Sequence, residues 1–322
     1  MKRKELEKTM NKKNKMSLKT IGSIAFALIL CITMFAACGN NNASAPEATP
    51  APAPAETPAP APAEPEPVDD LSGDITTAGS TSVQPLSQEL ADAFNVIHPN
   101  VIIDVQGGGS GQGVKAVEAD LVDFGALSRE LKDEEKEVVT HEYVIAKDGI
   151  AVVVNKDVGV DDLTKEQIKG IFTGAITNWS EVGGASAKIE VVAREEGSGT
   201  RDAFNELTGV LGKDADGNNV DNTIETALIQ GSTGAVKTTV ASTENSIGYI
   251  SEGAIDDSIK VLLVEGVAIS AATVLDGSYV ISRPFIYITG RELSPQAQAF
   301  IDFIFSAEGQ NVVKDSGFIS VA

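Results

Sequence analysis

The chain has 322 residues, 42% of them hydrophobic, and a formal net charge of −21 at pH 7. Its length and hydrophobic content suffice for one large core or two modest ones. The strong negative charge argues against nucleic acid as a partner.

Residues 1–37 are predicted to be a lipoprotein signal peptide. Met1–Lys19 holds eight Lys/Arg against two Glu, and an almost uncharged apolar run follows up to Cys38. A basic segment, an apolar run and a pair of small residues are typical of a secretory signal. The run also approaches the length of a membrane-spanning helix, so an uncleaved anchor remains the alternative.

Cys38 is predicted to be lipidated. The stretch "MFAACGN" resembles the lipobox of bacterial lipoproteins, in which cleavage before the cysteine frees its amino group and thiol for acylation. Cys31 is a poorer candidate because two bulky aliphatic residues precede it. The predicted location is therefore extracytoplasmic, lipid-anchored to a bacterial cell membrane, with no thiol pair left for a disulfide.

Residues 38–71 are predicted to be a spacer that follows the lipidated cysteine. Nine of the thirteen prolines lie in residues 40–68, interleaved with Ala and Glu. Such a composition favours a semi-rigid polyproline II segment, about 3.1 Å per residue, that holds a domain away from the membrane. The spacer indicates this geometry and no particular ligand.

The remaining sequence repeats a β-rich segment, a Gly/Ser/Thr cluster and a helix-periodic apolar run. In "DITTAGSTSVQPLSQELADAF" the apolar positions are Val83, Leu86, Leu90 and Phe94, after a predicted cap at residues 80–82. In "VIIDVQGGGSGQGVKAVEADL" they are Val114, Val117 and Leu121. In "IEVVAREEGSGTRDAFNELTGVL" they are Phe204, Leu207 and Leu211, and "LIQGSTGAVKTTVAS" is a fainter fourth instance.

These repeats predict a shared anion site. A helix start exposes unpaired N–H groups at the positive end of the helix dipole, and glycine allows close approach of a ligand. Such a site needs no net positive charge. Three independent structural caps remain the alternative, because a Ser/Thr cap after a strand is common in α/β proteins.

Arg194 supplies a fixed cation whose planar fork can bind two oxygens of a tetrahedral anion. The alternative is a surface arginine paired with Glu195 or Glu196. Arg201, seven residues on, is expected to be solvated. "GGGSGQGVK" fails the Walker and dinucleotide patterns, and the two histidines, His98 and His141, have no metal-ligand partner at helical spacing. We therefore predict no catalytic residue, no metal and no cofactor, and the protein is predicted not to be an enzyme.

Five segments occur in this order along the chain: "AGSTSVQPL", "GGGSGQGVKAV", "DFGALSREL", "REEGSGTRDAF" and "SIGYIS". In these segments, and over the whole stretch from about Gly73 to Ala322, the sequence resembles the PstS-type phosphate-binding lipoproteins of bacterial ABC uptake systems. The resemblance implies an α/β, type II periplasmic-binding-protein fold: two α/β lobes joined by two crossing strands, with a ligand cleft between them. The implied lobes are residues 72–148 plus 280–322 (lobe 1) and residues 149–279 (lobe 2).

The resemblance also implies the contacts of the anion. They fall on these residues: Thr81, Ser82, Ser110, Ser128, Arg194, Ser198, Gly199 and Thr200. Glu196 matches an acidic residue that orients the arginine. At Ser128 many members carry an aspartate that accepts the proton of hydrogen phosphate and rejects fully ionised sulfate. This aspartate-based test of protonation is missing here, which leaves the discrimination against sulfate or arsenate open.

The function that the resemblance implies is high-affinity binding of inorganic phosphate and its delivery to an ABC permease driven by an ATPase. The protein is expected to act as a monomer. The alternatives are a receptor for another or a broader range of oxyanions (sulfate, molybdate, arsenate), a secreted phosphatase, and a stalked adhesin or sensor.

Overall fold

The computed structural model describes residues 71–321. The predicted signal peptide, Cys38 and nearly all of the predicted spacer lie outside the described residues. Within residues 71–321 no helix combines the length and the hydropathy that a membrane span requires.

One hydrogen-bonded path of strands runs through the described residues, in the order β2-β1-β3-β13-β4-β10-β6-β9, with β11 also paired to β4. β1 pairs in parallel with β2 and β3, and β6 in parallel with β10 and β9, whereas β4 is antiparallel to β13 and β10. The bounds are β1 Gly73–Gly79, β2 Val101–Gly107, β3 Phe124–Leu127, β4 His141–Val154, β6 Glu190–Arg194, β9 Leu228–Gln230, β10 Ser246–Ser251, β11 Lys260–Val261 and β13 Ser282–Thr289.

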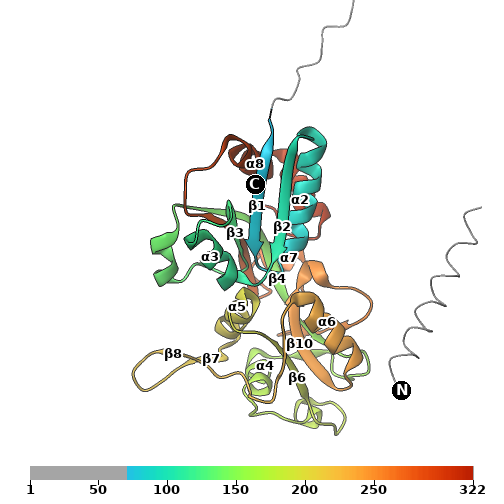
Figure 1. Ribbon diagram of the computed structural model, residues 1–322. Coiled ribbons are helices and arrows are strands. Elements are labelled where there is room, and N and C mark those ends of the chain that lie inside the picture. The colour runs from blue at the N-terminus through green and yellow to red at the C-terminus, as the bar shows by residue number, and fades with distance from the viewer. Residues whose placement is uncertain (1–70, 322) are drawn as a thin grey trace, which may run out of the picture. The chain divides into compact units, whose positions relative to one another are not determined.

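β4 joins two lobes (Figure 1). It pairs with β13 from His141 to Gly149 and with β10 from Ile150 onward. We call the group of β1, β2, β3 and β13 the β1 lobe, and the group of β6, β9 and β10 the β6 lobe. The chain returns at Ile281, whose carbonyl accepts a hydrogen bond from Ile150 N–H. The two-lobe α/β fold is thereby confirmed, while the exact residue boundaries of the lobes stay a prediction.

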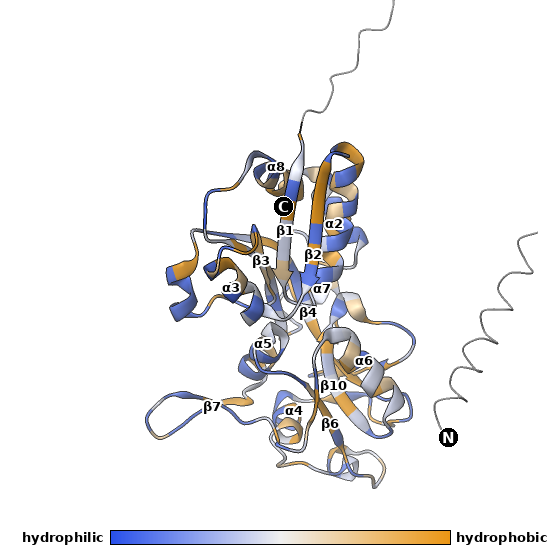
Figure 2. Ribbon diagram, in the orientation of Figure 1, coloured by the Kyte–Doolittle hydropathy of each residue, from blue (hydrophilic) through white to orange (hydrophobic). Residues whose placement is uncertain are grey.

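The helices of the β1 lobe bury one apolar face against its strands. They are α2 Gln84–Ile97, α3 Ser110–Glu118, α8 Pro295–Phe305 and α9 Ala307–Asp315. Val83, Leu86, Leu90 and Phe94 are fully buried, as their spacing predicts. Figure 2 shows hydrophobic and hydrophilic residues alternating along α2. Burial of these side chains, each worth about 1.5–3 kcal/mol, fixes α2 against the sheet.

The helices of the β6 lobe are α4 Lys165–Phe172, α5 Gly199–Thr208 and α6 Thr233–Ser242. Phe204 stacks on Tyr249 with ring centroids 4.0 Å apart, and Phe172 meets Phe204 edge-on at 4.8 Å. This aromatic cluster holds α5 against β10 at Tyr249. The start of α5 is therefore fixed relative to β6 and β10.

Two predicted helix positions are wrong. α3 ends at Glu118, and Leu121 lies beyond it with 72% of its surface exposed. α5 ends at Thr208, because its C-cap Gly209 adopts a left-handed conformation at φ 77°, and Leu211 begins a strand instead. Glycine takes this conformation without strain and so stops the helix before Leu211.

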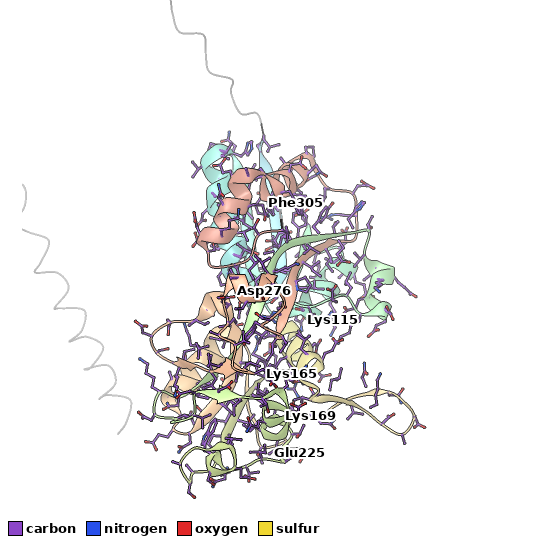
Figure 3. The ribbon with its side chains drawn as sticks, turned by 180° about the vertical axis from the view of Figure 1, so that it is seen from behind. Lys115, Lys165, Lys169, Glu225, Asp276 and Phe305 are labelled. Atoms are coloured by element: carbon purple, nitrogen blue, oxygen red, sulfur yellow. The ribbon has the colours of Figure 1, made fainter. Side chains whose placement is uncertain are left out.

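The smaller elements lie around the two lobes. β7 Leu211–Lys213 and β8 Asn219–Asp221 form a hairpin that projects from the β6 lobe, with a hydrophilic tip in Figure 2. β5 Asp162–Leu163 pairs with β12 Leu263–Val264, and α7 Ala271–Leu275 contacts β4. The 3₁₀ helices span Asp133–Val138, Trp179–Val182 and Glu252–Ala254. In Figure 3, Lys115 of α3 and Asp276 lie at the height where the two lobes meet.

Candidate anion-binding site

The chain segment between β1 and α2 forms the first part of the site. Ser80 O accepts hydrogen bonds from the N–H groups of Val83 and Gln84, so the chain turns tightly into α2. The predicted cap at residues 80–82 is wrong, because the N-cap of α2 is Val83 and no side chain caps the helix. The turn buries Ser82 to 2% exposure. Ser82 Oγ lies 2.8 Å from Thr200 Oγ1 in the other lobe. The first loop therefore contacts the start of α5.

Ser110 and Ser128 form the second part, also in the β1 lobe. Ser110 is the first residue of α3, and its Oγ accepts a hydrogen bond from Ser128 N–H at 3.1 Å. Ser80 Oγ donates to Ser128 Oγ at 2.8 Å. Both serines are fully buried. A Cβ added at Gly199 would overlap Ser110 Oγ and lie 2.9 Å from Ser128 Oγ, so the start of α5 abuts this pair.

The start of α5 is the third part. Ser198 caps the helix, accepting a hydrogen bond from Arg201 N–H at 3.3 Å. Gly199 and Thr200 are the first residues of the helix, where backbone N–H groups have no partner within the helix. Gly111 N–H donates to Gly197 O at 3.0 Å, which joins the second and third loops across the lobes.

Arg194 lies at the end of β6 and is 1% exposed. Its Nε and Nη2 donate to the two carboxylate oxygens of Glu195, each at 2.7 Å. Its Nη1 donates to Thr233 Oγ1 at 3.2 Å. A guanidinium has five N–H donors, so these three hydrogen bonds leave two N–H groups without a partner among the described residues, where an anion could bind.

The prediction that Glu196 orients the arginine is wrong. Glu195 makes both contacts, whereas Glu196 is exposed and lines a neighbouring hollow. The turn that follows β6 explains the difference. Ser198 N–H closes it onto Glu195 O, and Gly197 adopts φ 83°. This turn directs Glu196 to solvent and leaves Glu195 beside the guanidinium.

Arg201 also makes hydrogen bonds within the protein, so the expectation that it is solvated is wrong. Its Nε pairs with Asp221 of β8 at 2.7 Å, its Nη1 donates to Arg194 O, and its side chain is 17% exposed.

Tyr249 OH accepts a hydrogen bond from Arg194 N–H at 3.1 Å. Burial raises the pKa of Tyr249 above its ordinary value. This hydroxyl therefore stays neutral and fixes the backbone of Arg194.

Thr233 is a residue of the cluster that sequence reasoning missed. It is the first residue of α6 and 4% exposed. Its Oγ1 lies 2.9 Å from Ser82 Oγ and 3.4 Å from Thr81 Oγ1. Its N–H also donates to Thr81 Oγ1, at 3.2 Å. The available signal was the fainter fourth strand-to-helix segment, in which Ser232 caps α6.

All eight predicted anion contacts thus lie in or beside one cluster of hydroxyl groups, helix starts and Arg194. Thr81, Ser82, Ser110 and Ser128 come from the β1 lobe, and the other four come from the β6 lobe. Such a cluster offers many neutral donors and one cation in a buried place, where each hydrogen bond to an anion is strong. Among residues 71–321 no group of three or more His, Cys, Asp or Glu could hold a metal ion.

Arg129, next to Ser128, bridges the lobes beside the cluster. It binds both carboxylate oxygens of Glu135 at 2.7 Å and pairs with Asp202 of α5 at 2.9 Å. Burial alone would lower the pKa of Arg129, but its contacts with Glu135 and Asp202 leave it above the ordinary value. Two carboxylates thereby balance the charge of Arg129, so we assign this cation to ion pairs within the protein and not to the bound anion.

The model of the PBP superfamily domain matches residues 51–308. The chain belongs to the PBP superfamily. Within it, the chain is a member of the PstS group. It is 34% identical to "Phosphate-binding protein PstS" of Bacillus subtilis over 258 residues, 78% of this chain and 81% of that protein. A second relative, "Phosphate-binding protein PstS 2" of Streptococcus pneumoniae, is 51% identical over 135 residues. That match spans about half of each protein, 42% of this chain and 46% of the relative.

Two solved structures of the superfamily share the fold of this chain. One is a protein of Clostridium perfringens solved with bound phosphate, 42% identical, with a TM-score of 0.72 over 78% of this chain and all of that one (100%). The other is an ABC-type phosphate transport receptor from Vibrio cholerae, 35% identical, with a TM-score of 0.64 over 76% of this chain and 99% of that one. Each supports the two-lobe fold described above.

Proposed function

We propose that this protein binds inorganic phosphate outside the cytoplasm and delivers it to an ABC permease for uptake. The observation that carries the proposal is the buried cluster of hydroxyls and helix starts around Arg194, drawn from both lobes. Relatives and solved structures of the PstS group are named for phosphate binding or contain phosphate, which supports the same ligand.

The proposed mechanism is binding without chemistry. Phosphate enters between the lobes, and the four β1-lobe residues and the four β6-lobe residues contact it together when the lobes close. Arg194 supplies the full positive charge, and Glu195 holds its fork in place. Short-range donors in a buried site outweigh the screened negative charge of the surface. No nucleophile with its base is needed for this role.

Calorimetry on the whole chain, purified in mild detergent and dialysed free of phosphate, tests the ligand. Phosphate and sulfate are titrated in parallel into the wild type and Arg194→Ala. We expect tight phosphate binding, sulfate about a hundredfold weaker, and loss of phosphate binding in the variant. Lys188→Ala, which removes an exposed cation, is the matched control and should bind like the wild type.

The alternative functions predict other results in this titration or in an assay of ester hydrolysis. Comparable binding of phosphate and sulfate would indicate a receptor for a broader range of oxyanions, because Ser128 lacks the carboxylate that rejects fully ionised anions. Binding of neither anion would overturn the proposal and favour a stalked adhesin. Release of phosphate from a generic phosphate ester would favour the phosphatase.

We also propose that acylation of Cys38 anchors the protein to the cell membrane, with the permease and its ATPase as partners and the protein itself as a monomer. Several acyl chains on one residue give stable anchoring, whereas a single chain does not. Cys38→Ser should move the protein from the membrane fraction to the medium or periplasm. Retention of this variant in the membrane would instead support an uncleaved signal.

A further inference from the structure

The fourth strand-to-helix junction adds a contact to the cluster that is not among the eight predicted ones. β9 leads through Ser232 into α6, and Thr233 is the first residue of that helix. Ser232 caps the helix by accepting a hydrogen bond from Ala235 N–H at 3.1 Å. The cap leaves the Thr233 side chain free to turn inward, where it is 4% exposed.

Thr233 Oγ1 joins the cation to the opposite lobe. It accepts a hydrogen bond from Arg194 Nη1 at 3.2 Å and lies 2.9 Å from Ser82 Oγ. A hydroxyl that accepts from a guanidinium keeps its own proton for another acceptor. The β1-lobe hydroxyls nearest to it are Ser82 Oγ at 2.9 Å and Thr81 Oγ1 at 3.4 Å, so this proton lies where residues of both lobes meet.

Thr233 also completes the positioning of Arg194. Glu195 holds the Nε and Nη2 side of the guanidinium, and Thr233 holds Nη1. Glu195 and Thr233 together fix the plane of the guanidinium, so the directions of its two remaining N–H donors are also fixed. A planar fork held at both sides loses little conformational freedom when it binds an anion.

We propose that Thr233 is a further anion-site residue, which positions Arg194 and donates its hydroxyl proton to the bound oxyanion. The proposal rests on the proposed phosphate-binding function. It makes α6 the second helix of the β6 lobe, after α5, to contribute to the site. It also links closure to binding, because the same hydroxyl contacts Ser82 of the β1 lobe.

The test compares Thr233→Val, Thr233→Ser and Thr238→Val in the whole chain. Valine keeps the shape of threonine and removes the hydroxyl, and serine restores the hydroxyl. Thr238 is the matched control, because it lies on the exposed side of α6. Among the described residues, its hydroxyl donates a hydrogen bond only to Gly234 O of the same helix, at 3.0 Å. Phosphate affinity is measured by calorimetry, and the melting temperature is measured in phosphate-free buffer.

We expect Thr233→Val to weaken phosphate binding about tenfold to a hundredfold, as loss of a hydrogen bond to a charged group does. Thr233→Ser should recover affinity to within about threefold of the wild type, and Thr238→Val should bind like the wild type. The melting temperatures without phosphate distinguish a loss of affinity from a loss of folding stability, because only the second lowers the melting temperature. A structural role alone would lower the melting temperature of Thr233→Val and leave the affinity of its folded fraction unchanged.

The two proposals fail in different ways. Wild-type protein that binds no phosphate overturns the proposed function and this inference with it. Wild type that binds phosphate tightly while Thr233→Val binds equally well overturns only the role of Thr233. Failure of Thr233→Ser to recover affinity would also contradict it, because the hydroxyl would then not be the group that matters.

Discussion

Gly199 shows how closely the two lobes approach at the level of single residues. It is the first residue of α5, and a Cβ there would overlap Ser110 Oγ of the β1 lobe. The conflict arises only when the lobes are together, because Ser110 and Gly199 belong to different lobes. A side chain at this position should therefore oppose closure more than it opposes folding.

We expect Gly199→Ala to weaken phosphate binding about tenfold to a hundredfold, since overpacking a tight contact costs about 1–3 kcal/mol. The melting temperature in phosphate-free buffer should change little. Gly234→Ala is the matched control, because Gly234 is the second residue of α6 and a Cβ there meets nothing within 4 Å. Equal phosphate affinities for the two variants in calorimetry would contradict this account of Gly199.

Some contacts of single residues at the site could not be predicted from the sequence. The types of residue at the site could be predicted, since Ser and Thr after a strand indicate a helix start and Arg194 indicates an anion. The choice between Glu195 and Glu196 could not, because it depends on the turn that Gly197 makes at φ 83°. Thr233 could not be distinguished from other Ser and Thr residues at helix starts, because its contacts join segments 39 and 151 residues apart.

At the scale of elements, hydrophobic spacing predicted where helices pack better than where they end. Val83, Leu86, Leu90 and Phe94 are buried as predicted, because burial of one face determines the helix. Leu121 and Leu211 continue the same spacing but lie beyond α3 and α5. Periodicity counts apolar residues and does not detect the local backbone geometry that ends a helix.

The ion pair between Arg129 and Asp202 is an element-scale contact across the lobes. Arg129 follows β3, Asp202 lies in the first turn of α5, and Lys132 also pairs with Asp202, at 3.1 Å. Arg129 stays paired with Glu135 within its own lobe at 2.7 Å. The contact with Asp202 therefore stabilises the closed arrangement without being needed for the fold of either lobe.

We expect Asp202→Asn to weaken phosphate binding about threefold to tenfold, because a partly buried ion pair contributes about 1 kcal/mol. Binding to the wild type should become weaker as salt is added, and binding to the variant should depend less on salt. Asp133→Asn is the matched control, because Asp133 pairs with Lys136 on the surface and its side chain is 96% exposed. Calorimetry at low and high salt measures both effects, and a variant with wild-type affinity at both would argue against a role in closure.

At the scale of the whole molecule, the two lobes are joined where β4 and β13 meet, and a buried ion pair lies there. Arg283 donates to Asp148 Oδ2 through Nε and Nη2, at 3.1 and 2.9 Å. Ser251 Oγ and Glu252 N–H donate to Asp148 Oδ1. Glu252 lies beside this group, and its Oε2 is buried without a hydrogen-bond partner among the described residues. Burial and the nearby charge of Asp148 raise the pKa of Glu252 to about 7.

This raised pKa should make stability depend on pH through the join between the lobes. The folded protein holds a proton on Glu252 up to about pH 7, whereas the unfolded chain releases it near its ordinary pKa of about 4.3. Between these values the folded state binds more protons, so the free energy of unfolding falls as pH rises. Above about pH 7 the loss is complete, because the carboxylate is then ionised in both states.

Glu252→Gln keeps the shape of the side chain and removes its titration. Relative to the wild type, its melting temperature should be slightly higher at about pH 5 and clearly higher at about pH 8. Thermal unfolding in phosphate-free buffer measures the difference, and the comparison of the two proteins cancels the titration of all other groups. The matched control is Glu265→Gln, because Glu265 is exposed and its carboxylate accepts a hydrogen bond from Lys165 N–H. A difference between Glu252→Gln and the wild type that stays constant with pH would show that Glu252 is ionised throughout, and the join between the lobes would then be indifferent to pH in this range.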